Sequence, residues 1–158
     1  MRPEDARAFL EVHHTAVRGL GAKDYSPEVV DSWAPLPITD SDVESARENP
    51  EDELRLIAEI DGRVVGIGVL LAKTHQLRAC YVAPEASRKG VGSALLRELE
   101  RAARQQNLTV LEVDSSVNAK MFYVSHGYEC GEHGEHMLNN GQRMACVKMR
   151  KTLVLQTS

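Results

Sequence analysis

The sequence is poor in aromatic residues, cysteines and long apolar segments. Aromatic residues make up 4% of the 158 positions, and the three cysteines, Cys80, Cys130 and Cys146, are widely spaced and odd in number. This pattern excludes a small disulfide-stapled scaffold and indicates free thiols in a reducing, cytoplasmic environment. The longest apolar run, 64–72, is far shorter than the roughly 20 residues of a membrane-spanning helix.

The chain also lacks an excess of positive charge. Its net charge is −4, whereas nucleic acids and anionic membranes favour basic surfaces, so neither is expected as a main partner. Residues 1–5 contain no apolar segment after their one basic residue, so a secretory leader is not expected. A hydrophobic fraction of 42% is enough for one core. We therefore expect residues 1–158 to form a single domain.

The apolar periodicity changes along the first half of the chain. Apolar residues recur every three or four positions at the start, and Ser26 followed by Pro27 is a typical helix start. From Leu54 alternate residues are apolar, which predicts strands, and Asp61-Gly62 predicts a tight hairpin. The expected helices cover residues 6–20, 27–33 and 40–48, and the expected strands cover 54–60, 64–71 and 77–83.

The second half predicts a long helix and then a strand–helix–strand crossover. The helix runs from Gly90 to about Asn107, and Glu100 and Arg104 are expected to pair on its exposed side. Its apolar stripe consists of Val91, Leu95, Leu99 and Ala102. The other elements are strands over 109–113, 128–138 and 143–150 and a helix over 119–125. This order of elements predicts an α+β fold with a mixed sheet.

The glycine loop before the long helix is the most informative segment. Gly90 and Gly92 let the backbone approach a bulky anion, Arg88 and Lys89 add positive charge, and the helix start offers unpaired N–H groups. Together these features predict a pyrophosphate cradle. A plain helix start packed against the sheet is the alternative. The loop is not a P-loop, which needs Lys and Ser or Thr directly after the second glycine. It is not a dinucleotide fingerprint either, because that motif needs a third glycine.

Residues 77–128 resemble the core of the GNAT acetyltransferase superfamily. That family shows a strand ending in V-x-P, then R/Q-x-x-G-x-G/A before a long helix, and later F-Y-x-x-x-G-F/Y. The corresponding segments here are Val82-Ala83-Pro84, Ser87-Arg88-Lys89-Gly90-Val91-Gly92 and Phe122-Tyr123-Val124-Ser125-His126-Gly127-Tyr128. The order, the spacing and the elements between the motifs agree over about a third of the chain.

The resemblance implies a GNAT fold, with a central mixed, mostly antiparallel sheet that is splayed at the acetyl-CoA site and flanked by helices. It implies an N-acetyltransferase that uses acetyl-CoA as co-substrate and transfers the acetyl group directly to a primary amine of a small molecule or peptide. Tyr123 would protonate the leaving thiolate, which the acidities of phenols and thiols allow. The residues implied to bind acetyl-CoA are Cys80, Tyr81, Val82, Arg88, Lys89, Gly90, Val91, Gly92, Ser93, Asn118 and Tyr123.

Several positions depart from the family pattern or leave alternatives open. Ser87 stands where the family usually has Arg or Gln, so we expect Arg88 to supply the charge and acetyl-CoA to bind more weakly. Asn118 is equally consistent with an ordinary helix cap. Cys80 is expected to contribute its backbone, since a nucleophilic thiol would need an adjacent base. Residues 1–5 leave almost no room for the short strand with which family members usually begin.

The proton acceptor for the incoming amine is not defined by the motifs. A lysine-like amine is mostly protonated at pH 7, so its reaction needs a base. Some family members have a Glu on the strand before the loop, but the corresponding residue here is Gln76. Candidate bases are Glu59, His75, Glu135 and His136. A water-mediated base or a less basic acceptor is the alternative.

Two further features concern the acceptor side. The resemblance implies that the segment from His13 to Trp33 shapes the acceptor site. Tyr25 and Trp33 are expected to line that site, with ordinary core or interface packing as the alternative for Trp33. The histidines and cysteines near the C-terminus, including His133 and His136, do not have the spacing of common zinc sites, so no metal is expected.

Other functions are compatible with the cradle. A non-catalytic acyl-CoA-binding regulatory module would retain the cradle without turnover; Ser87 favours this alternative and Tyr123 argues against it. An acetyltransferase acting on charged transfer RNA would favour a basic face, which the composition lacks. The resemblance also allows a homodimer through the C-terminal strands.

Overall fold

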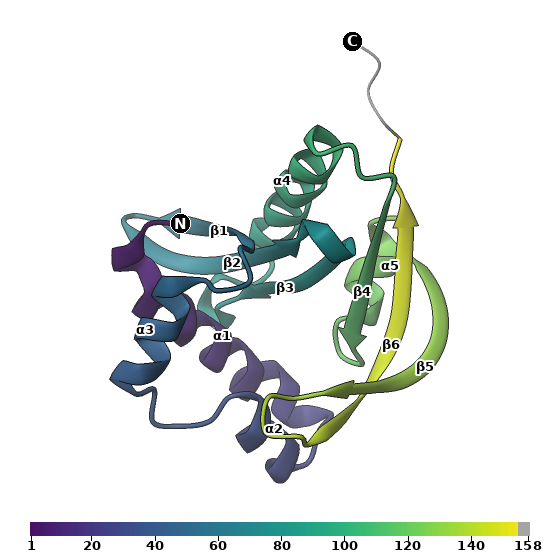
Figure 1. Cartoon of the computed structure of the whole chain (residues 1–158). Helices are drawn as coiled ribbons and strands as arrows, with labels where there is room; N and C mark the ends of the chain where they lie inside the picture. Colours follow the sequence, from purple (N-terminus) through teal and green to yellow (C-terminus); the bar gives the residue numbers. More distant parts are fainter. Residues whose placement is uncertain (155–158) are drawn as a thin grey trace.

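The computed structural model describes residues 1–154, which form one mixed six-stranded sheet with helices on both faces (Figure 1). The strand order is β1-β2-β3-β4-β6-β5. The strands are β1 (Leu54–Ile60), β2 (Arg63–Leu71), β3 (Gln76–Val82), β4 (Val110–Ser116), β5 (Glu129–Met137) and β6 (Arg143–Thr152). The α-helices are α1 (Ala6–Leu20), α2 (Pro27–Trp33), α3 (Asp40–Glu48), α4 (Val91–Gln105) and α5 (Lys120–Ser125). The expected α+β class and element order are confirmed, and no helix within residues 1–154 is long and apolar enough to cross a membrane.

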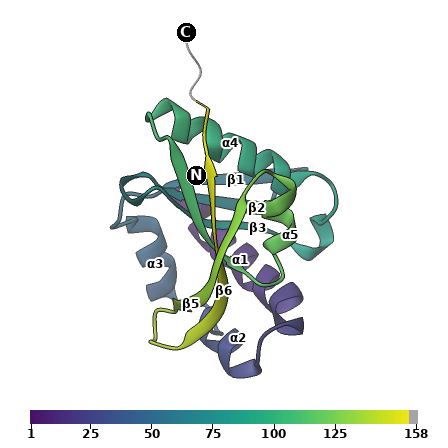
Figure 2. The same cartoon turned by 90° about the vertical axis from the view of Figure 1, so that its right-hand side faces the viewer.

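The hairpin between β1 and β2 forms as the sequence predicts. Asp61 and Gly62 both have positive φ angles, 52° and 79°, as the tight two-residue turn of a hairpin requires. On one face of β2, Ile67 and Val69 pack in a core cluster with residues of α1. Helix α1 thus packs on one face of β1–β3 and α4 packs on the other, as Figure 2 shows.

Helix α4 lies close to β2 because two facing positions in the strand are glycines. A Cβ atom at Gly66 would lie 2.8 Å from a side-chain carbon of Val91, and one at Gly68 would lie 2.8 Å from a side-chain carbon of Leu99. The helix therefore packs directly against the backbone of β2. This contact fixes the beginning of α4 beside the end of β3, where the glycine loop lies.

Strands β3 and β4 are parallel neighbours, but they pair over only two residues. Gln76 pairs with Glu112 and Leu77 with Val113, and the N–H of Glu112 donates to the carbonyl of His75 at 2.8 Å. Beyond these pairs the strands diverge, which Figure 1 shows between β3 and β4. The sheet is open at this point, as the family resemblance implied.

Two expectations about α4 and β4 are wrong. Glu100, expected on the exposed side of α4, is 4% exposed, and its carboxylate accepts hydrogen bonds from Lys151 at 2.7 and 3.0 Å. Arg104 instead donates to the carbonyl of Val154 at 3.1 Å. The strand expected to end at Val113 continues to Ser116, because its polar residues pair with β6.

Candidate active site

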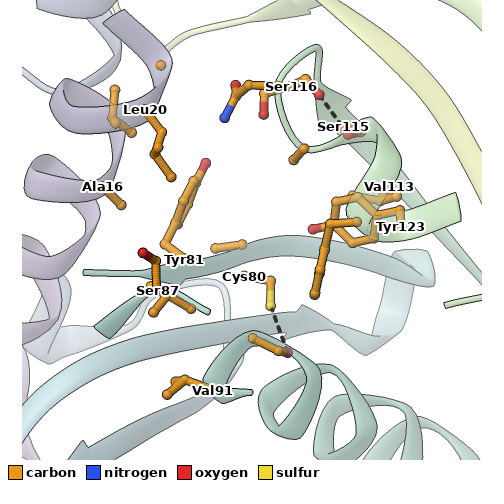
Figure 3. A pocket seen from close by; sticks show the side chains of 18 of the residues that line it. Ala16, Leu20, Cys80, Tyr81, Ser87, Val91, Val113, Ser115, Ser116 and Tyr123 are labelled. Atoms are coloured by element: carbon orange, nitrogen blue, oxygen red, sulfur yellow. Dashed lines mark hydrogen bonds between the residues drawn. The ribbon is translucent and has the colours of Figure 1, made fainter. Parts of the chain in front are cut away.

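The parted strands β3 and β4 border a cavity of about 330 Å³ that reaches the beginning of α4 (Figure 3). The residue before the helix, Gly90, has a φ angle of 80°, a left-handed conformation that glycine adopts without steric cost. Within residues 1–154 no side chain caps this helix start. The N–H groups of its first turn are therefore available to an anion.

All the residues that the resemblance implied for acetyl-CoA, except Lys89, line this cavity. Lys89 is exposed beside the loop, whereas Arg88 and Ser87 both contribute to the lining. Asn118 is not the cap of α5, because that position is Ala119. The side chain of Ser93 contacts His126 through a 2.9 Å hydrogen bond, which ties the first turn of α4 to the end of α5.

The backbone of β3 forms one wall of the cavity. Residues 78–82 all line it, and within the described residues they have no pairing partner on the β4 side. An unpaired strand edge can accept an extended ligand as an added strand. Cys80 lies on this edge, and its thiol faces the carbonyl of Gly92 at 3.7 Å. Burial raises the pKa of the Cys80 thiol to about 12, so a nucleophilic thiolate is disfavoured at neutral pH.

Tyr123 of α5 presents its hydroxyl to the cavity (Figure 3). The residue is 4% exposed, and its ring packs against those of Phe122 and Tyr128 at centroid distances of 5.2 and 5.4 Å. Burial raises the pKa of Tyr123 well above its usual range, so the phenol is protonated at neutral pH. A protonated hydroxyl that faces the cavity is a candidate proton donor.

A second cavity of about 610 Å³ adjoins the first where β3 and β4 part. Helix α1, the end of α2 and the tip of the β5–β6 hairpin contribute to its walls. The residues shared by both linings mark the junction of the two cavities: Trp33, Arg78, Ala79, Tyr81, Asp114 and Ser116. A ligand in the second cavity would reach a ligand in the first at this junction.

Aromatic rings surround His13 of α1 beside the junction. Its ring centroid lies 5.0 Å from that of Tyr81 and 6.5 Å from that of Trp33. Burial, with a smaller contribution from the neighbouring His14, lowers the pKa of His13 to about 4. His13 is therefore neutral at pH 7. Trp33 packs in this cluster and also lines the two cavities, so packing and lining do not exclude each other, and its place in the acceptor site stays a prediction.

Asp114 places a carboxylate at the junction of the cavities. Its Oδ1 accepts a hydrogen bond from Lys148 at 2.9 Å, and its Oδ2 accepts one from His136 Nδ1 at 3.1 Å. Burial alone would raise the pKa of Asp114, but the hydrogen bonds from Lys148 and His136 outweigh it and keep the pKa below its ordinary value. Because β6 lies between β4 and β5, Asp114 and His136 meet across that strand.

The structure separates the other residues expected on the acceptor side. Trp33 and His136 line the second cavity, and Gln76 does so too. Tyr25 does not: its hydroxyl donates to the carbonyl of Ala145 at 2.6 Å and accepts from the N–H of Val117 at 2.9 Å. Tyr25 therefore anchors the segment before α2 to β6 and to the turn after β4.

The remaining candidate bases also lie outside both cavities. Glu59 follows a register shift near the end of the edge strand β1 and lines neither cavity. His75 occupies a left-handed turn before β3, with a φ angle of 59°. Glu135 lies 4.0 Å from Arg143 on the exposed hairpin.

Sequence reasoning missed Asp114 and Arg78, and it included His13 only as the start of a segment. Asp114 was missed because the apolar run ends at Val113. A usable signal was present in the sequence, since Leu111, Val113 and Ser115 alternate and leave Asp114 on the opposite face of an extended strand. Nothing comparable marks Arg78, which pairs with Glu53 at 3.2 Å at the beginning of β1.

Comparison with known families identifies the domain. The sequence model of the acetyltransferase (GNAT) domain matches residues 21–153. The chain belongs to the GNAT family. It is therefore an N-acetyltransferase, and acetyl-CoA is its co-substrate.

Relatives of this GNAT chain support the same assignment. YafP, an uncharacterized N-acetyltransferase of Escherichia coli strain K12, is 27% identical over 128 residues, which cover 81% of this chain and 77% of YafP. A GCN5-related N-acetyltransferase structure from Rhodopseudomonas palustris has a TM-score of 0.85 and 29% identity, over 97% of this chain and 92% of that one. The PaiA N-acetyltransferase of Thermoplasma acidophilum, solved with coenzyme A, has a TM-score of 0.74 and 21% identity, over 97% and 96% of the two chains, and shows the shared fold.

Proposed function

We propose that this chain transfers the acetyl group of acetyl-CoA directly to a primary amine of a small molecule or peptide. The observation that carries the proposal is the Tyr123 hydroxyl, which faces the cavity between the parted strands while its ring is buried. Residues 1–158 act as one domain. The three cysteines are free, which supports activity in the reducing cytoplasm.

The residues around the first cavity suit the binding of acetyl-CoA. The N–H groups of Gly92 and Ser93, at the beginning of α4, hold the pyrophosphate with Arg88. The edge of β3 at Cys80–Val82 pairs with the pantetheine amides. Acetyl-CoA supplies an activated thioester carbonyl. Tyr123 then gives its proton to the leaving thiolate; burial raises the pKa of Tyr123, so the phenol is protonated at neutral pH before this transfer.

The experiment compares Tyr123→Phe with Tyr128→Phe. Both rings are buried, but Tyr128 does not line the cavity, and its buried hydroxyl has no partner within the described residues. Calorimetric titration measures acetyl-CoA binding, and thiol release measures turnover with benzylamine, putrescine, lysine and an unblocked tripeptide. We expect Tyr123→Phe to lower kcat about 100-fold with an unchanged Kd, and Tyr128→Phe to alter neither value.

The same measurements test the competing function. Ser87 at the cradle favours a regulatory module that binds acyl-CoA without turnover. Binding of acetyl-CoA with no turnover of any amine would support that module. An absence of binding would overturn both functions.

A further inference from the structure

A lysine-like acceptor needs a proton acceptor before it can react. An alkylammonium group has a pKa of about 10.4, so roughly one molecule in 10³ is neutral at pH 7. In the proposed reaction the second cavity holds the acceptor, and it is called the acceptor cavity below. Gln76 lines this cavity but cannot accept a proton from an ammonium group. The base must therefore come from another residue of this cavity.

His136 has the hydrogen-bonding arrangement of a general base. Its Nδ1 donates to Asp114 Oδ2 at 3.1 Å, because the ionised carboxylate can only accept. In the neutral ring, Nε2 then carries a lone pair. His136 lines the acceptor cavity, and Asp114 lines both cavities, so the pair extends from the acceptor cavity to the junction. The carboxylate also stabilises the ring once Nε2 has gained a proton.

We propose that His136 is the general base that deprotonates the acceptor amine, and that Asp114 positions it. This assignment rests on the proposed function, because it concerns the acceptor of that reaction. Lys148 completes the arrangement: its ammonium group lies 2.9 Å from Asp114 Oδ1 and holds the carboxylate in place from β6.

The other titratable groups of the cavity are less suited to act as the base. They are His13, His14, Asp42, Glu51, Glu53, Arg55, Arg78, Tyr81 and Cys146. Burial raises the pKa of Tyr81 and of Cys146, so both are protonated at neutral pH. His13 has a pKa of about 4, and among the described residues no carboxylate pairs with it to stabilise its protonated form. Both ring nitrogens of His14 contact backbone carbonyls, at 2.8 and 3.0 Å.

The carboxylates of the cavity wall are also held by partners. Glu53 binds Arg55 at 2.7 Å, and Glu51 pairs with Arg78. Asp42 accepts from the N–H of Thr39 at 2.9 Å and caps α3. Within residues 1–154, His136 thus combines a free Nε2 with an ionised partner on Nδ1.

The proton balance of the reaction follows from this assignment. The ammonium group gives one proton to His136 Nε2, which passes it to solvent. The neutral nitrogen forms a bond to the thioester carbonyl carbon, and the carbon–sulfur bond breaks with its electron pair going to sulfur. Tyr123 protonates the sulfur and regains a proton from the acetylated nitrogen. The net products are the amide, coenzyme A and one released proton.

The experiment uses amine basicity as its readout. The most active alkylamine of the panel is compared with its oxyamine analogue, in which an oxygen beside the nitrogen leaves the group neutral at pH 7. We expect His136→Gln to lower kcat/KM for the alkylamine by about 100-fold or more, and to change kcat/KM for the oxyamine far less. Asp114→Asn should show the same selectivity with a smaller loss. His133→Gln, on the opposite face of β5, is the matched control and should behave as wild type.

The outcomes distinguish a failure of the His136 assignment from a failure of the proposed function. Equal losses for both amines in His136→Gln would mean a structural role and overturn the assignment, as would an unchanged alkylamine rate. In either case turnover by the wild-type protein would leave the proposed function standing. If the wild type turns over no amine, the proposed function fails and the assignment fails with it. Calorimetric titration should give the wild-type Kd for acetyl-CoA in His136→Gln and His133→Gln, because neither residue lines the first cavity.

Discussion

Lys151 Nζ lies 2.7 Å from Oε1 of Glu100 and 2.8 Å from the carbonyl of His126, so one ammonium group joins α4, β6 and the residue after α5. The Glu100 side chain is 6% exposed. The ammonium group also lies 5.5 Å from the centroid of the Tyr128 ring. The pair therefore holds α5, which carries Tyr123, against the rest of the domain.

Removing one member of this pair should be costly, because the other charge would remain buried. We expect Lys151→Met to lower the free energy of unfolding by about 3–5 kcal/mol, measured by urea denaturation at pH 7. Arg101→Met is the matched control, since Arg101 pairs with Glu98 on the exposed side of the same helix. It should leave the denaturation midpoint unchanged. A Lys151→Met protein as stable as wild type would contradict the structural role.

Coenzyme affinity should depend on the charge at the start of the glycine loop. We expect Ser87→Arg to tighten acetyl-CoA binding about tenfold or more, because one charge-assisted hydrogen bond contributes about 1.5–3 kcal/mol. Arg88→Ala should weaken binding by a similar factor. Calorimetric titration at two salt concentrations measures both effects. Lys89→Ala is the control, since Lys89 does not line the cavity, and a loss in this variant equal to that in Arg88→Ala would contradict the geometry.

Stability should decrease in acid partly through His13. Its pKa is lowered by burial from 6.5 to about 4 in the folded protein, so between these values the unfolded chain binds a proton that the folded chain does not. The resulting loss of folding stability is absent above pH 6.5, grows as the pH falls and reaches roughly 3 kcal/mol near pH 4. Between pH 7 and pH 4, the free energy of unfolding of His13→Leu should fall by about 2–3 kcal/mol less than that of the wild type, as measured by urea denaturation. The exposed His133→Gln should lose as much as wild type.

The close packing of α4 on β2 should make a larger residue at Gly68 destabilising. We expect Gly68→Ala to lower the free energy of unfolding by about 1–3 kcal/mol, because its Cβ would lie 2.8 Å from a carbon of the fully buried Leu99. Gly68→Ala should lower the free energy of unfolding less when it is introduced into Leu99→Val than when it is introduced into the wild type, because the shorter valine leaves room for the added Cβ. Strictly additive losses in thermal and urea denaturation would show that the two positions do not compete for space.

Local patterns predicted the parts of this fold that depend on neighbouring residues. Asp61-Gly62 forms its hairpin because both residues tolerate positive φ angles. Glu100 was misplaced because its partner, Lys151, lies 51 residues away on β6, a later strand of the chain. A helical pattern cannot show which side a later strand will cover.

The candidate site shows the same limit. The glycine loop and Tyr123 belong to contiguous motifs, so their resemblance to a family was visible in the sequence. Asp114 and His136 come together only because β6 inserts between β4 and β5, an order that no local periodicity predicts. Residues that bind the coenzyme are therefore readable from motifs here, while those that meet the acceptor depend on strand order.

The two-residue pairing of β3 with β4 has a mechanical consequence. Strands β1–β3 with α4 hold the cradle, while β4–β6 with α5 hold Tyr123, Asp114 and His136. Over residues 1–154 the backbone ladder joins the two halves only at Gln76 and Leu77. A ligand in the cavity would contact both halves, because residues of β3, β4 and α5 all line it. It would therefore link the two halves in the region where the backbone ladder does not.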